Sequence, residues 1–252
     1  MRRNPVRERW AKGEAASNLW IDIGWPVTVE ALGRLPYDSY TVDLQHSLID
    51  RSVLVSLFQA LSLGTGAPMV RVTQNDPGEI AFVLDAGAYG VICPTIETAE
   101  QCRAFVAACE YPPRGVRSWG PTRGVMYGGA DYFDNYRSEI LTIALIETAQ
   151  GIRNLDAIAA VPGLDMIYLG PNDLGVSHGA KPSYTPNHPE VDRAMDLVVA
   201  AAKKHSIAAG MHTGTKEVAL AAKEKGYKLL SLGYASKMMA AAATQVLKDA
   251  FD

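Results

Sequence analysis

Two carboxylates stand where apolar, strand-like runs of the sequence end. Glu147 closes the run 141–147, and Asp173 follows the run 166–170 after two intervening residues. If both runs are strands of a parallel barrel, their carboxyl ends open at the same mouth. Hard divalent cations prefer oxygen ligands, and a magnesium-like ion commonly takes only one or two protein carboxylates. The pair predicts a site for Mg²⁺, Mn²⁺ or Co²⁺, unless Glu147 caps the next helix and Asp173 belongs to a surface turn.

A cation interrupts another strand-like run, 68–72, where Arg71 follows two apolar residues. Burying a charge is costly unless the charge is paired, so an arginine at a strand end is expected to meet an anion or a carboxylate. Its planar guanidinium suits a bidentate grip on a carboxylate or an enolate. The alternative is a purely structural pair with Asp43 or Glu147.

Asp43 and His46 follow the run 39–44, again at a strand end. A carboxylate can fix the tautomer of an imidazole and keep it basic, so the two side chains could move a proton directly or through a water molecule. The alternative is a structural histidine in a turn. The proton-transfer interpretation gains support because four strand ends deliver polar groups to one mouth.

Four further residues are weaker candidates. Trp20 could form a wall of the pocket or belong to the core, and His212, with Thr213, could contact the variable part of a substrate. Asp85 follows a helix at the opposite side of the barrel, which favours a helix-terminal or interface role. The sequence has no phosphate-binding loop, dinucleotide fingerprint or nucleophile elbow.

The elements that must position these residues alternate along the whole chain. The predicted strands are 18–24, 39–44, 68–72, 90–94, 141–147, 166–170, 208–212 and 228–233. The predicted helices are 27–34, 51–63, 77–86, 97–109, 152–160, 189–205, 216–225 and 236–251. Eight strand–helix repeats without a change in composition favour a (β/α)8 TIM barrel over an open doubly wound sheet.

The barrel is expected to be a single domain over residues 1–252. Residues 1–16 are basic at their start and are interpreted as an exposed N-terminal arm. The segment 110–139 is too long for an ordinary barrel connection and suits a functional or interface loop. The C-terminal helix 235–252 has a broad apolar face, which must pack either on its own barrel or on a neighbouring subunit.

Composition limits the partners of this 252-residue chain. Its 24 basic and 27 acidic residues give a formal net charge of −3, so there is no global attraction to nucleic acid or to an anionic membrane. No apolar run is long enough to span a bilayer or to serve as a signal peptide, and cytoplasm is the expected location. The three cysteines lack metal-ligand spacing and are expected in the core.

Seven motifs, in this order along the chain, resemble the HpcH/HpaI family of metal-dependent pyruvate aldolases. The resemblance extends from about residue 20 to residue 232. The motifs are Asp43-x-x-His46, Val70-Arg71-Val72, Leu84-Asp85-Ala86-Gly87-Ala88, Val91-Ile92-Cys93-Pro94, Tyr111-Pro112-Pro113-Arg114-Gly115-Val116-Arg117, Ile146-Glu147 and Gly170-Pro171-Asn172-Asp173-Leu174.

The resemblance implies a divalent-metal-dependent aldolase that reversibly cleaves 4-hydroxy-2-oxo acids to pyruvate, or hydroxypyruvate, and an aldehyde through an enolate held at the metal. Glu147 and Asp173 would bind the metal. Arg71 would stabilise the enolate, and His46 with Asp43 would serve the acid/base step. The backbone of Gly170, Pro171, Asn172 and Asp173 would hold the carboxylate of the 2-oxo acid.

The resemblance also implies a homo-oligomer, a hexamer in which the C-terminal helix is exchanged between subunits. Asp85 would then reach a neighbouring subunit's site. The chain departs from the family pattern at Gln45, where many relatives have Glu, and at Leu145, where some have a polar residue. These departures leave the donor and the aldehyde open. The rival functions are a coenzyme A ester lyase of the malyl or citramalyl type and a noncatalytic metabolite-binding barrel.

Overall fold

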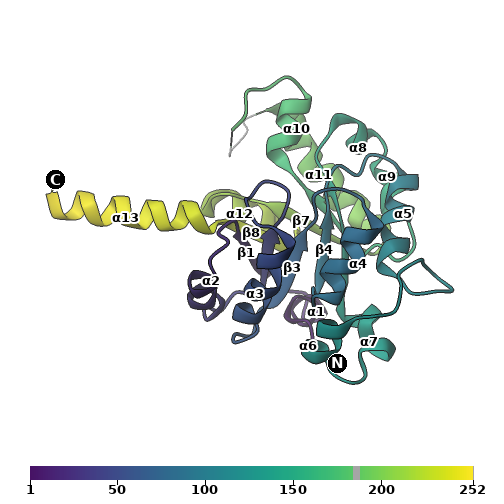
Figure 1. The fold of residues 1–252 in the computed structure, drawn as a ribbon. Coiled ribbons are helices and arrows are strands. Elements are labelled where there is room, and N and C mark those ends of the chain that lie inside the picture. Colours follow the sequence, from purple (N-terminus) through teal and green to yellow (C-terminus); the bar gives the residue numbers. More distant parts are fainter. Residues whose placement is uncertain (184–187, 252) are drawn as a thin grey trace.

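The computed structural model describes residues 1–183 and 188–251. Eight parallel strands close into a barrel in sequence order, from β1 to β8, and helices surround it (Figure 1). The strands are β1 Ala16–Ile21, β2 Ser39–Asp43, β3 Ala67–Arg71, β4 Gly90–Cys93, β5 Leu141–Ile146, β6 Met166–Leu169, β7 Ala208–His212 and β8 Leu229–Tyr234. The predicted TIM barrel is confirmed.

The helices differ most from the prediction where they are short. They are α1 Pro5–Ala11, α2 Pro26–Gly33, α3 Arg51–Leu61, α4 Pro77–Asp85, α5 Ala99–Cys109, α6 Thr122–Gly128, α7 Tyr132–Glu139, α8 Ala149–Arg153, α9 Leu155–Ala159, α10 Pro171–Ser177, α11 Pro189–Lys204, α12 Lys216–Lys225 and α13 Ala235–Phe251. The single helix expected over 152–160 is two short helices, and α1, α6, α7 and α10 were not predicted.

The strands are almost entirely buried, because one face lines the barrel interior and the other lies under the helices. Strands β2 to β6 are buried at every position, which explains why they read as continuous apolar runs rather than alternating ones. The register pairs Asp43 with Arg71 across β2 and β3 and aligns the ends of β5 and β6 at Ile146 and Leu169. Neighbouring strand ends therefore present their polar residues side by side.

A chain of hydrogen bonds crosses the barrel interior below the mouth. The Tyr168 hydroxyl donates to Ser231 Oγ at 2.6 Å, and Ser231 Oγ donates to Asn18 Oδ1 at 2.8 Å. Asn18 Nδ2 donates in turn to the hydroxyls of Ser39 and Thr41 at 3.0 and 2.9 Å. Because these buried polar groups are mutually satisfied, they fix the floor of the site without a large desolvation cost.

The amino-terminal end of the barrel is covered by α1, so the expectation of a wholly exposed arm is wrong. Val6 is fully buried and packs in the apolar cluster of the barrel interior that includes Met69 and Leu229. Asn4, also fully buried, caps α1 and donates to the backbone oxygens of Tyr89 and Glu139 at 3.1 and 2.6 Å. A helix this short would be unstable in isolation, and the burial of Val6 and the hydrogen bonds of Asn4 keep it folded.

The segment 110–139 lies at the same amino-terminal end, because it connects the end of α5 to the start of β5 (Figure 1). It contains α6 and α7 and an aromatic cluster in which the Tyr111 ring lies 5.2 Å from Trp119 and 5.5 Å from Phe133. Trp119 and Phe133 are more than half exposed. The segment does not reach the mouth of its own barrel, and its role at an interface stays a prediction.

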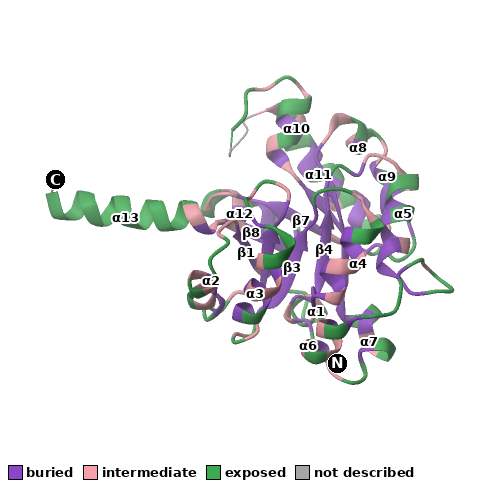
Figure 2. Ribbon diagram, viewed as in Figure 1, coloured by how far each residue is buried: buried purple, intermediate pink, exposed green. Residues whose placement is uncertain are grey.

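The C-terminal helix α13 projects away from the barrel instead of folding back on it (Figure 1). Past Ala235 it is largely exposed (Figure 2), and the apolar residues Val246 and Phe251 are exposed at 68% and 84%. The alternative of packing on its own barrel is therefore wrong, and docking on a neighbouring subunit stays a prediction. Among the described helices, none is long and apolar enough to cross a membrane.

Candidate active site

An ion pair between adjacent strands forms one half of the barrel mouth. Arg71 donates from Nε to Asp43 Oδ1 at 2.9 Å and from Nη2 to Oδ2 at 2.5 Å, and both side chains are buried. Burial opposes ionisation of Asp43, but the hydrogen bonds and charge of Arg71 outweigh it, so the pKa of Asp43 lies below its ordinary value. The Arg71 guanidinium also lies 5.1 Å from the centre of the Trp20 ring.

His46 is placed by Asp43, although not in the way the sequence predicts. Asp43 Oδ1 accepts the backbone N–H of Gln45 at 3.0 Å and that of His46 at 3.4 Å. The carboxylate therefore fixes the turn after β2 rather than the tautomer of the imidazole, since both of its oxygens already face Arg71. The His46 side chain is exposed at the mouth and lines the cavity described below.

The other half of the mouth holds the two predicted metal ligands. Glu147, only 5% exposed, follows β5, and its Oε1 accepts the backbone N–H and the hydroxyl of Thr95 at 2.9 and 3.2 Å. Asp173 lies in the first turn of α10. Burial and the neighbouring Asp173 charge raise the pKa of Glu147 to about 7. Glu147 does not cap the following helix, because Thr148 has that position in α8.

The geometry of this half fits a hard divalent cation. A Cβ atom on Gly170 would lie 2.9 Å from Glu147 Oε2, so the glycine keeps that oxygen accessible. Among the described residues, no basic side chain forms an ion pair with Glu147 or Asp173. In the described part of the chain, no group of three or more His, Cys, Asp or Glu side chains is arranged so that it could hold a metal ion by itself. Two carboxylates with space beside them suit Mg²⁺ or Mn²⁺ better than a structural zinc.

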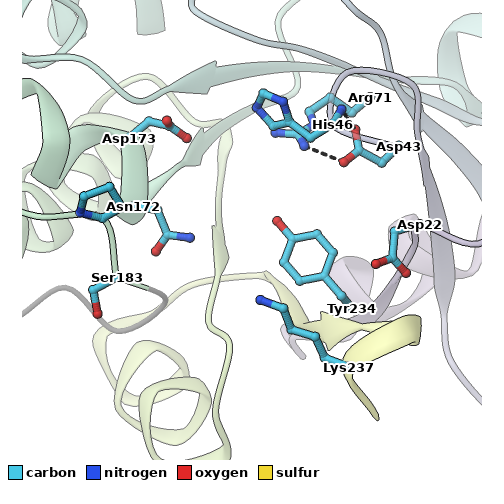
Figure 3. Close-up of a pocket in the computed structure, with 10 residues that line it drawn as sticks. Asp22, Asp43, His46, Arg71, Asn172, Asp173, Ser183, Tyr234 and Lys237 are labelled. Atoms are coloured by element: carbon cyan, nitrogen blue, oxygen red, sulfur yellow. Dashed lines mark hydrogen bonds and ion pairs between the residues drawn. The ribbon is translucent and has the colours of Figure 1, made fainter. Parts of the chain in front are cut away.

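A cavity of about 380 Å³ opens between these two halves (Figure 3). A smaller hollow of about 30 Å³ lies deeper and is lined by both halves, through Arg71 and Glu147. Asn172 and Tyr234 line both spaces. The deeper hollow is near the volume of one water molecule. The site therefore has a narrow inner part beside the carboxylates and a wider outer part.

Three polar atoms at the inner hollow are buried without a hydrogen-bond partner among the described residues. They are Trp20 Nε1, Asn172 Oδ1 and His212 Nε2. A buried polar atom left unpaired costs roughly 1–3 kcal/mol, so such a group indicates a bound ligand or water. Burial, with the positive charges of Arg71 and Lys237, lowers the pKa of His212 to about 4, which keeps the imidazole neutral near pH 7.

Asp85 lies far from the other predicted residues, at the end of α4 on the amino-terminal side of the barrel. It accepts a hydrogen bond at 2.8 Å from Nη2 of Arg117, a buried arginine that also contacts the Tyr132 hydroxyl. The structure thus brings together Trp20, Asp43, His46, Arg71 and His212 with Glu147 and the segment 170–173, but not Asp85. The predicted contact of Asp85 with a neighbouring subunit's site stays a prediction.

Reasoning from sequence missed several residues of the site, among them Asp22, Thr95, Tyr234 and Lys237. Asp22 and Tyr234 come at or just after the ends of β1 and β8, so the strand-end rule that selected Glu147 could have found them. Thr95 and Lys237 could not be found in this way, because neither stands at the end of a strand. Thr95 lies in a turn and has a positive φ, and Lys237 lies in the first turn of α13.

Comparisons with known proteins extend over nearly the whole chain. The family model described as HpcH/HpaI aldolase/citrate lyase matches residues 16–242. A hydroxypyruvate/pyruvate aldolase of Rhizorhabdus wittichii is 34% identical over 247 residues, which cover 98% of each chain. A 5-keto-4-deoxy-D-glucarate aldolase of Klebsiella pneumoniae is 34% identical over 250 residues, covering 98% of this chain and 96% of the relative.

Among solved structures, an HpcH/HpaI aldolase/citrate lyase family protein from Burkholderia cenocepacia matches with a TM-score of 0.91 at 29% identity. The match covers 99% of this chain and all of the other. The sequence and structure comparisons thus both extend over the whole barrel. The chain belongs to the HpcH/HpaI aldolase/citrate lyase family and is a lyase.

Proposed function

We propose that this chain is a divalent-metal-dependent aldolase that reversibly cleaves 4-hydroxy-2-oxo acids to pyruvate, or hydroxypyruvate, and an aldehyde. One observation carries the proposal: the buried Glu147 carboxylate faces a second carboxylate, Asp173, and shares a small hollow with Arg71. The names of the relatives, which include hydroxypyruvate/pyruvate aldolase, support the choice of donor.

Glu147 and Asp173 are the residues that would hold the cation. A divalent ion there would act as a Lewis acid toward the 2-oxo group of the substrate. Thr95 would orient Glu147, because it already binds Oε1 and leaves Oε2 on the side of Gly170. The raised pKa of Glu147 fits this role, since a cation bound between two neighbouring carboxylates would favour the ionised form of both.

Arg71 would stabilise the negative charge that develops as the carbon–carbon bond breaks. Cleavage of the C3–C4 bond passes its electrons to the 2-oxo acid fragment, which becomes an enolate. Asp43 holds the guanidinium in one orientation through its Nε and Nη2 atoms, so the charge is in place before the reaction begins. A preorganised charge of this kind is commonly the largest single contribution to catalysis.

The proton of the 4-hydroxyl must leave as the aldehyde carbonyl forms. His46 is placed to accept it, directly or through a water molecule, because its side chain lies exposed at the cavity next to the Asp43–Arg71 pair (Figure 3). Returned to C3, the same proton converts the enolate to pyruvate. Each step runs backwards in the aldol addition, so the atoms and charges balance in both directions.

The start of α10 would bind the carboxylate of the 2-oxo acid. Backbone N–H groups in the first turn of a helix have no acceptor within that helix, and those of Asn172 and Asp173 lie beside the inner hollow. Trp20 and His212 would close the far wall, where their unpaired ring nitrogens can bind a substrate oxygen or water. Oxygen atoms of the donor would then reach the inner hollow, and the rest of the substrate, with the aldehyde part, would lie in the outer cavity.

A panel assay tests the function. Purified protein is incubated with pyruvate or hydroxypyruvate, a set of aldehydes and Mg²⁺, Mn²⁺ or Co²⁺, and the products are identified by mass and chirality. The proposal expects metal-dependent adducts with at least one aldehyde. The absence of any adduct would contradict it, and cleavage of malyl- or citramalyl-coenzyme A instead would favour the thioester lyase.

We also propose that the chain acts as a homo-oligomer, a hexamer, with α13 at the interface. The support is the exposed apolar face of α13. Asp85, at the far end of its own barrel, would influence catalysis most simply by approaching another subunit's mouth. Sedimentation of the full chain and of a version truncated before Ser236 tests this. A fully active monomer would contradict the oligomer, and an intact hexamer after truncation would exclude α13 from the interface.

A further inference from the structure

We propose that a cavity at the amino-terminal end of the barrel binds a phosphate monoester, held between the guanidinium groups of Arg2 and Arg123. The cavity has a volume of about 500 Å³ and lies between α3 and α6. No described residue lines both this cavity and a space at the barrel mouth. The inference is therefore independent of the aldolase function proposed above.

Arg123 is an exception among the arginines of the chain. Four arginines are at least partly withdrawn from solvent, and three of them have an aspartate within ion-pair distance. The three pairs are Arg7–Asp165, Arg71–Asp43 and Arg117–Asp85. Burial lowers the pKa of Arg123, and among the described residues only Tyr127 opposes that shift. Burial of an unpaired charge is costly, so Arg123 indicates an anionic partner.

The backbone and two aromatic rings fix the Arg123 guanidinium in its place. Its Nη1 atom donates to the backbone oxygen of Ala86 at 2.7 Å, and the group lies 5.6 Å from the centre of the Tyr127 ring and 5.8 Å from that of Phe58. A Cβ atom on Gly87, where φ is +103°, would lie only 2.7 Å from the same Nη1 atom. The bond to Ala86 engages one of five guanidinium N–H groups, which leaves donors for an oxyanion.

Arg2 brings a second positive charge to the same ring. Its guanidinium lies 4.5 Å from the centre of the Tyr127 ring. Its backbone N–H donates to the oxygen of Gly128 at 2.6 Å, which anchors it at the end of α6 (Figure 1). Burial raises the pKa of the Tyr127 hydroxyl, and the charges of Arg2 and Arg123 oppose that shift. Both cations are therefore close enough to Tyr127 to act on one ligand beside it.

The lining of the cavity favours a phosphate monoester. No described acidic residue lines it, so the two positive charges are not balanced within it. A phosphate monoester carries close to two negative charges near pH 7, and its oxygens match the forked donors of a guanidinium. Val55 and Met126 offer apolar surface to the organic part, and Gln59 and Ser62 offer polar groups. A cavity of this size can hold a small organic molecule.

Titration calorimetry with three probes tests the inference. The probes are phenyl phosphate, inorganic phosphate and phenol, which separate the charged group from the apolar body. The proteins are the wild type, Arg123→Met, Arg2→Met and Gln59→Glu, and the last places a carboxylate in the cavity without removing either arginine. The matched control is Arg51→Met, an exposed arginine of α3 whose guanidinium lies 5.2 Å from the centre of the Phe82 ring.

We expect the wild type to bind phenyl phosphate more tightly than inorganic phosphate, and not to bind phenol. Arg123→Met and Gln59→Glu should each weaken the binding of phenyl phosphate by roughly tenfold or more, because donors to a charged group are removed or are taken by the new carboxylate. Arg2→Met should weaken it roughly threefold, since Arg2 is exposed and water screens its charge. Arg51→Met should bind like the wild type, and added salt should weaken binding.

Unchanged affinity in Gln59→Glu and in folded Arg123→Met would overturn the inference, because the phosphate would then bind elsewhere, as at the barrel mouth. Absence of binding to the wild type would also overturn it. Inorganic phosphate bound as tightly as phenyl phosphate would contradict the monoester, since the apolar lining would contribute nothing. Sedimentation completes the test. A smaller oligomer in Arg123→Met, without phosphate binding by the wild type, would assign the two cations to a carboxylate of a second copy.

Discussion

The two halves of the barrel mouth hold a buried carboxylate in opposite electrostatic states. On the β2–β3 side, Asp43 is bound on both oxygens by Arg71, and its pKa is lowered. On the β5–β6 side, Glu147 has no ion-pair partner among the described residues, and burial and the charge of Asp173 raise its pKa to about 7. Both carboxylates are almost fully buried, so the difference comes from their neighbours and not from their exposure.

The difference shows how one barrel mouth can hold a fixed positive charge on one side and a pair of carboxylates able to bind a cation on the other. On the β2–β3 side, Asp43 and Arg71 together carry no net charge, and the arginine is fixed before any substrate binds. The β5–β6 side has an excess of negative charge, which a cation from solution can neutralise. The arrangement follows from strand order, because an acid and a base end the neighbouring strands β2 and β3, whereas two acids follow the ends of the neighbouring strands β5 and β6. Removal of the metal and substitution of single residues can alter each side of the mouth separately.

The largest effect is expected on the side that lacks its own cation. Exhaustive chelation should abolish aldol activity, and Mg²⁺, Mn²⁺ or Co²⁺ should restore it. Glu147→Gln should lower turnover by more than roughly 100-fold, the upper end of losses for residues that only support a metal ligand. Metal binding, measured by titration calorimetry, should weaken together with activity.

Glu217→Gln, on the exposed surface of α12, is the matched control and should behave like the wild type. If metal-free protein kept full activity, the assignment of Glu147 and Asp173 as ligands would be wrong. Activity lost in Glu147→Gln without any loss of metal affinity would instead make Glu147 a group that contacts the substrate.

A smaller loss is expected on the side that carries its own cation. Arg71→Lys keeps the charge but cannot reproduce the two-atom contact with Asp43, so the ammonium would not be held in place. We expect kcat to fall by roughly 100-fold even at saturating substrate, near the loss caused by removing one preorganised donor.

The control for this variant is Arg103→Lys, which lies on the exposed face of α5. Circular dichroism would show whether Arg71→Lys remains folded. Wild-type turnover in the folded variant would reduce Arg71 to the structural partner of Asp43 that the sequence also allowed.

Most of the fold could be predicted from sequence, because the strands are buried on both faces and alternate with long helices. The short helices could not. Helices α1, α6 and α7 lie in segments that read as an arm and a loop, and their stability depends on distant partners such as Glu139, which accepts the backbone N–H of Asn4 at 2.7 Å. Contacts between residues so far apart in the chain leave no signal in the local sequence.

The site could be predicted as far as it depends on charged residues at strand ends. Arg71, Glu147 and Asp173 were selected for that reason, and the structure places them around connected cavities. The way in which Asp43 acts could not be predicted, because a carboxylate three residues before a histidine can bind either its ring or its backbone. Lys237 was missed because its place at the cavity depends on the bonds between Ser236 and Asp22.

A third ionisable group, His212, extends the comparison. Its effect is expected to be the smallest, and it concerns the stability of the fold instead of the reaction rate. Burial first, and then the charges of Arg71 and Lys237, lower the pKa of His212 from 6.5 to about 4. The unfolded chain therefore binds a proton before the folded one as the pH falls. The stabilisation is complete above pH 6.5 and is lost between pH 6.5 and 4. His212→Gln cannot bind this proton and should lack that part of the pH dependence.

Urea unfolding at pH 7.5 and pH 5 measures the effect. The wild type should lose about 2 kcal/mol more than His212→Gln between these two values, from the displacement of the His212 pKa alone. Because other groups titrate alike in both proteins, the difference isolates one imidazole even if the variant is less stable at both pH values. Equal losses would mean that His212 is protonated in the folded protein at pH 5. The mouth would then hold a third positive charge, beside those of Arg71 and Lys237, and the wall formed by His212 and Trp20 would be cationic instead of neutral.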